Sequence, residues 1–154
     1  MKPRTNCFWL TACVVLLPAA AGAKDLNTLA RILYAAFAAE QSAVICSSSH
    51  PNFNRETAGK AGDMRAYAQH IKLEVTEGLN ETDTDLVLKA AAGRARAETS
   101  EQLQNLRSDS PSAEALALSR WCMTIATKLV RQVIATHDEH HTEIDQMMAK
   151  SKQE

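Results

Sequence analysis

Apolar residues recur at steps of three and four positions in four segments of the chain, at about residues 25–47, 57–79, 82–107 and 111–150. This spacing places the apolar side chains on one face of an α-helix. Pro51, Gly78 and a Ser-rich stretch at 108–112 interrupt the pattern, and such residues are typical of helix ends. The sequence therefore predicts an all-α fold of four helices with short connections, arranged as an antiparallel four-helix bundle with a long C-terminal helix.

A different pattern precedes these helices. Lys2 and Arg4 stand before an apolar stretch at 8–17, and Pro18 and the small residues Ala21 and Ala23 follow it. This order is that of a secretory signal peptide cleaved after Ala23. The run is too short to span a bilayer, which takes about 20 apolar residues. We therefore expect residues 1–23 to be removed and residues 24–154 to form one exported helical domain, periplasmic or secreted, without a membrane span.

A second interpretation of the N-terminus stays open. Residues 10–13, which end in Cys13, resemble the cleavage site of a bacterial lipoprotein. Cleavage there would leave the apolar residues Val14 to Leu17 on the mature protein.

The charge balance limits the partners. Residues 1–23 contain two of the 17 basic residues and none of the 18 acidic ones, so 15 basic residues face 18 acidic ones after cleavage. Phosphate binding requires a basic surface, so this balance argues against a nucleic-acid partner. It argues equally against a polybasic helix on a membrane surface.

Two of the four cysteines lie in the predicted signal peptide, which leaves Cys46 and Cys122. In an oxidising compartment, two cysteines most simply form one disulfide. No C-x-x-C motif is present, which argues against a thioredoxin-like active site. We expect a structural Cys46–Cys122 bridge, worth on the order of 4 kcal/mol in the chain-entropy model.

The densest group of metal-capable side chains begins at His137 and continues the apolar stripe of the last helix. His137 and His141 are four residues apart, which puts them on one helix face. Asp138, His141 and Asp145 form a second aligned set, and His140 directly precedes His141 in the same cluster. Imidazole and carboxylate ligands suit Zn, Ni or Cu ions.

Two histidines on one helix make an incomplete metal site, so a third ligand has to come from elsewhere, for example His70 or Glu40. The alternative is that the cluster is the solvated end of a long helix. Catalytic signatures such as a nucleophile elbow or a phosphate-binding loop are absent from the sequence.

These observations predict an exported, non-catalytic helical protein that acts through contacts with an envelope protein and needs no cofactor. Binding or sensing of a divalent metal through the His137–His141 cluster is the alternative function. A third hypothesis is an acid-stress chaperone, because five histidines and 18 acidic residues change charge as the pH falls.

Overall fold

The computed structural model describes residues 24–153, so the predicted signal peptide and Cys13 lie outside the described residues. Its regular structure is helical throughout this range, which confirms the predicted all-α fold. The elements are α1 (Leu26–Ser49), α2 (Phe53–Glu56), α3 (Lys60–Thr76), α4 (Glu81–Gln104), α5 (Pro111–Trp121), a π-helical turn η1 (Cys122–Ala126) and α6 (Thr127–Lys152).

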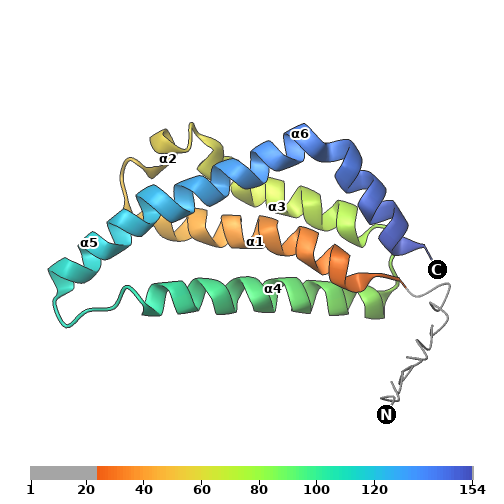
Figure 1. Cartoon of the computed structure of the whole chain (residues 1–154), viewed down its shortest axis with the longest axis horizontal. Helices are drawn as coiled ribbons and strands as arrows, with labels where there is room; N and C mark the ends of the chain where they lie inside the picture. Colours follow the sequence, from red (N-terminus) through yellow and green to blue (C-terminus); the bar gives the residue numbers. More distant parts are fainter. Residues whose placement is uncertain (1–23, 154) are drawn as a thin grey trace, which may run out of the picture.

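The long helices alternate in direction, and α1 lies at their centre (Figure 1). The most extensive helix contacts are those of α1 with α4, α3 and α6. In a regular four-helix bundle each helix packs against two neighbours, so that finer prediction is not confirmed. By length and composition alone α1 could cross a membrane, and 44% of its most apolar stretch is buried inside the structure.

The helix starts follow from local chemistry. The Asp25 carboxylate accepts the Thr28 N–H at 3.1 Å and so caps α1. Asn80 accepts the Asp83 N–H at 2.8 Å and caps α4, so the capping residue lies ahead of the Thr and Asp positions that begin the predicted segment. The predicted start of the fourth segment is confirmed, because the Ser110 side chain caps a helix whose first residue is Pro111.

The segment between α1 and α3 departs from the sequence pattern. Ala58 and Gly59 have φ angles of 54° and 80°, a left-handed pair that delays the start of α3 to Lys60. Gly59 adopts this backbone without the steric cost that a side chain brings. Upstream of this pair, α2 places Phe53 in the core with no exposed surface. A residue in a predicted loop is thus a core residue.

The predicted disulfide is present. Cys46 and Cys122 are 76 residues apart in sequence and 5.5 Å apart at their Cα atoms. The bridge joins the last turn of α1 to η1, where Trp121 and Ala126 are buried beside it. In η1, the Thr127 hydroxyl donates to the Cys122 carbonyl at 2.9 Å, five residues back, as the wider turn allows.

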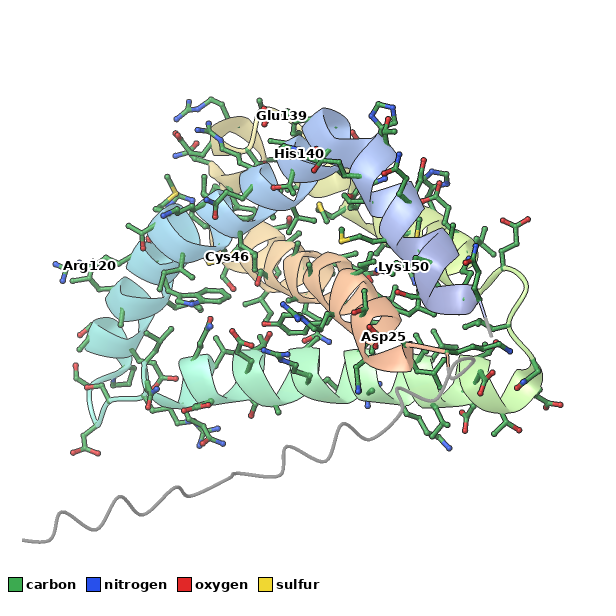
Figure 2. The ribbon with its side chains drawn as sticks, turned by 45° about the vertical axis from the view of Figure 1, so that its right-hand side comes forward. Asp25, Cys46, Arg120, Glu139, His140 and Lys150 are labelled. Carbon is green, nitrogen blue, oxygen red and sulfur yellow. A yellow bond between two sulfur atoms is a disulfide. The ribbon has the colours of Figure 1, made fainter. Side chains whose placement is uncertain are left out.

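The helix α6 contacts the core at its two ends and rises between them (Figure 1). Its buried residues are Thr127 and Val130 near the start, and Met148 and Ser151 near the end. We call residues 131–147 the arch, because none of its side chains is fully buried. His140 has φ −123° and ψ 21°, which bends the helix at the top of the arch (Figure 2).

Hydrogen bonds return the end of α6 to the rest of the molecule. The Asp25 N–H donates to the Ser151 carbonyl at 2.9 Å. The Lys152 ammonium donates to the Glu74 carbonyl at 2.6 Å. Asp25 and Lys150 accordingly lie at one end of the molecule in Figure 2. The arch therefore has an anchor on each side.

Candidate functional site

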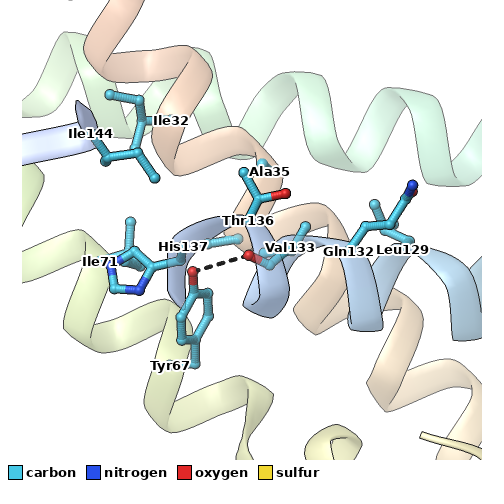
Figure 3. Close-up of a pocket in the computed structure, with 11 residues that line it drawn as sticks. Ile32, Ala35, Tyr67, Ile71, Leu129, Gln132, Val133, Thr136, His137 and Ile144 are labelled. Atoms are coloured by element: carbon cyan, nitrogen blue, oxygen red, sulfur yellow. Dashed lines mark hydrogen bonds between the residues drawn. The ribbon is translucent and has the colours of Figure 1, made fainter. Parts of the chain in front are cut away.

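A cavity of about 490 Å³ lies beneath the arch, between α1, α3 and α6 (Figure 3). Its volume is within the 300–1,000 Å³ that ligand sites typically have. Most of its walls are aliphatic, and its lining comprises Ile32, Ala35, Ala36, Tyr67, Ile71, Leu129, Gln132, Val133, Thr136, His137 and Ile144. We call it the arch cavity.

The arch makes this cavity by lifting the apolar stripe of α6 away from α1. Val133 and Ile144 lie on either side of the bend at His140. Figure 3 shows Ile144 beside Ile32 of α1 at one side and Val133 near Tyr67 at the other. Apolar side chains that would meet in a close helix pair thus line an open space.

Tyr67 and His137 form a polar edge of the cavity. The Tyr67 hydroxyl donates to the Val133 carbonyl at 3.5 Å, a long hydrogen bond. The two rings meet edge to face, with centroids 5.4 Å apart. Burial raises the pKa of the Tyr67 phenol, and the nearby carboxylates of Asp138 and Glu74 raise this pKa further. The edge is therefore partly desolvated and lies in a negative field.

Glu74 follows Tyr67 and Ile71 on the same face of α3, because these residues are spaced by four and three positions. Its Oε1 lies 3.2 Å from Nε2 of His70. Its Oε2 lies 3.9 Å from Nε2 of His137, which is too far for a hydrogen bond. This second oxygen is buried and has no hydrogen-bond partner. It is an acceptor without a donor next to a cavity-lining residue.

The structure distributes the predicted metal ligands over different surroundings. His137 is half-buried against α3, whereas Asp138, His140, His141 and Asp145 are exposed. The bend at His140 falls between His137 and His141, so a spacing of four no longer places these two on one face. Among residues 24–153, no three His, Cys, Asp or Glu side chains are grouped to hold a metal ion.

Of the two suggested third ligands, His70 does lie near His137, with ring centroids 6.5 Å apart. Glu40 instead lines a separate hollow between α1 and α3, together with Met64. Metal binding by the cluster stays a prediction, and in the described structure His70 and Glu74 are better placed to support it than His141.

A second hollow, of about 460 Å³, lies between α1, α4 and the start of α6. It shares Leu129 and Gln132 with the arch cavity. Its walls are more polar, since they include Glu98 and Lys128, and Ile125 at its edge is 50% exposed. The two hollows therefore flank the same stretch of α6.

Two important residues of the site, Tyr67 and Glu74, were not among the sequence-predicted candidates. Tyr67 belongs to the apolar stripe of its helix and is ordinary there. Glu74 carries a weak signal, because it lies three residues after Ile71 and so within the helix face that Tyr67 and Ile71 define. Their importance depends on α6 lying across them, which no local pattern specifies.

Comparison with known proteins gives no assignment for this arrangement. No family model matches the chain, and neither a curated protein nor a solved structure matches it significantly.

Proposed function

We propose that the protein is an exported, non-catalytic binding protein that holds a small apolar molecule in the arch cavity. The observation that carries this proposal is the cavity itself, which has ligand-sized volume, mostly aliphatic walls and four polar side chains. Apolar pockets with a few convergent polar groups are the usual form of small-molecule sites.

The chemistry of the lining favours binding over catalysis. Its polar side chains are Tyr67, Gln132, Thr136 and His137. The Tyr67 hydroxyl donates to the Val133 backbone carbonyl and not to a side-chain base, so it is not placed as an activated nucleophile. The disulfide at one end of α6 gives the site a rigid support, which lowers the cost of ordering on binding.

The test is a titration of the mature protein with 1-N-phenylnaphthylamine, an uncharged dye whose fluorescence rises when it leaves water. We expect saturable binding to the wild type. Ala35→Phe fills the cavity from α1 and should weaken binding at least tenfold. Ala97→Phe on the exposed face of α4 makes the same change away from the cavity and should leave binding within twofold. Dye binding that does not saturate, or an affinity that Ala35→Phe leaves unchanged, would refute the proposal.

A contact with an envelope protein is the second candidate. The half-exposed Ile125 beside the second hollow favours it, because an apolar side chain at the edge of a hollow between α1, α4 and α6 is one that a partner could cover. A photo-crosslinking residue at Ile125, compared with one at the exposed Leu86 of α4, would identify the partner. The purified partner must then bind the wild type, and lose at least tenfold in affinity for Ile125→Glu, for this candidate to stand.

A further inference from the structure

We propose that the arch cavity selects an apolar molecule with a cationic, hydrogen-bond-donating head over an anionic one of the same size. This inference rests on the proposed function, because it assigns the ligand class of the same cavity. A primary alkylammonium ion is the simplest member of that class.

The aliphatic walls bind the apolar part of such a ligand. The cavity is lined by Ile32 and Ile71 from α1 and α3, and by Val133 and Ile144 from α6. These last two residues lie before and after the bend at His140. Each methylene group that leaves water for an apolar site gains about fourfold in affinity. Affinity should therefore grow with chain length until the cavity is full.

The head of the ligand is selected at the polar edge. Glu74 lies one helical turn beyond Ile71 on α3, and a turn is about 5.4 Å long. Its buried Oε2 has no hydrogen-bond partner and lies 3.9 Å from Nε2 of the His137 ring, which lines the cavity, whereas Glu74 is not itself a lining residue. A donor that passes this ring would satisfy an acceptor that folding leaves unpaired, which is favourable because unpaired buried groups are costly.

The electrostatic surroundings point in the same direction. The carboxylates of Asp138 and Glu74 both act on the Tyr67 phenol inside the cavity. The nearby basic groups contact other atoms of Glu74: His70 faces Oε1, and the Lys152 ammonium binds the Glu74 backbone carbonyl. A cationic donor at Oε2 thus gains an acceptor, whereas a carboxylate head at the same place would bring acceptor oxygens together with no donor between them.

The experiment displaces 1-N-phenylnaphthylamine with decylamine, decanol and decanoate, each below its micelle concentration and at neutral pH. We expect decylamine to displace the dye at a concentration at least tenfold lower than decanoate, with decanol between them. Glu74→Gln should reduce the difference between amine and acid to within threefold and leave decanol unchanged. Glu77→Gln removes the same charge from an exposed position after α3 and should keep the preference.

Each outcome has a defined meaning. If none of the three compounds and no dye binds, the proposed function itself fails. If all three bind equally, or decanoate binds best, the cavity remains a binding site and the charge selection is wrong. An amine preference that survives Glu74→Gln but falls with Glu77→Gln would show general attraction to an acidic surface and would also overturn the inference. The wild-type comparison decides the sign of the preference even if a variant fails to fold.

Discussion

The two ends of α6 are held against the core by different means. At the first end, the Cys46–Cys122 bridge lies in a buried cluster with Trp121 and Val130. At the other end, Met148 belongs to a separate buried cluster with residues of α1, α3 and α4. Hydrogen bonds from the Asp25 N–H to Ser151 and from Lys152 to Glu74 add to this contact. The first anchor is covalent and the second is not.

This difference indicates how a ligand could enter the arch cavity. Proteins open locally in cooperative units, and segments with few buried contacts open at the lowest free energy. Between Val130 and Met148 the arch has no fully buried side chain. We expect the C-terminal end of α6 to lift while the disulfide end stays in place, so that the cavity opens on the side of Ile144.

Breaking the covalent anchor should have the largest effect. Cys46→Ser with Cys122→Ser removes a crosslink between residues 76 apart, and should lower the free energy of unfolding by about 4 kcal/mol in the chain-entropy model. Urea denaturation measures this change. The double variant should be insensitive to reductant, and the reduced wild type should match it. A loss below about 1 kcal/mol would show that packing alone holds this end.

Weakening the other anchor should have the next largest effect. Met148 is 5% exposed and Met147 is 47% exposed, so neighbouring positions supply a matched pair. Met148→Ala should cost about 2–3 kcal/mol, the low end for buried methionine, and Met147→Ala less than about 0.5 kcal/mol. Hydrogen exchange should accelerate in residues 141–152 of Met148→Ala and stay unchanged around Val130. Equal acceleration at both ends would contradict independent anchors.

The comparison also separates what the sequence specifies from what it does not. Periodicity specified the long helices, and the Ser-rich stretch at 108–112 marked a boundary between two of them, because both signals depend on neighbours within a few residues. The Cys46–Cys122 pairing could be predicted because residues 24–154 contain no other cysteine. These features could be predicted because they follow from local sequence patterns or from the number of cysteines.

The bend at His140 could not be predicted in the same way. Helix kinks usually occur at Pro, Gly or a π-bulge, and residues 137–143 contain neither Pro nor Gly. The bend accompanies the attachment of α6 at both ends, which is a tertiary constraint. The arch cavity depends on this bend. The apolar stripe of α6 therefore predicted residues that line the site, but it did not predict that a cavity separates them from α1.

The sequence-based metal hypothesis yields the third prediction. Calorimetry with Zn, Ni and Cu ions should show that any affinity depends on the half-buried end of the cluster. We expect His137→Ala and His70→Ala each to weaken binding about tenfold, as for a lost ligand or its support, and His141→Ala to change it less than twofold. Equal losses of metal affinity in the His137 and His141 variants would instead support the sequence-based hypothesis that these two histidines bind the metal together. Absence of binding by the wild type would remove the metal hypothesis.

The smallest expected effect concerns pH and the non-covalent anchor. The Asp25 carboxylate accepts hydrogen bonds from the Thr28 hydroxyl and N–H, which lower its pKa. A lowered folded-state pKa contributes stability that is complete above the unfolded value of about 3.9 and is lost as the pH falls through the folded value.

Asp25→Asn keeps a capping acceptor but removes the titration. Thermal melts should therefore show a constant difference between wild type and variant above about pH 5, followed by a relative loss of wild-type stability below about pH 4. The Asp25 N–H also binds Ser151, so hydrogen exchange in residues 141–152 should accelerate over the same pH range in the wild type alone. Parallel pH profiles for both proteins would exclude Asp25 as a link between acid and the opening of α6.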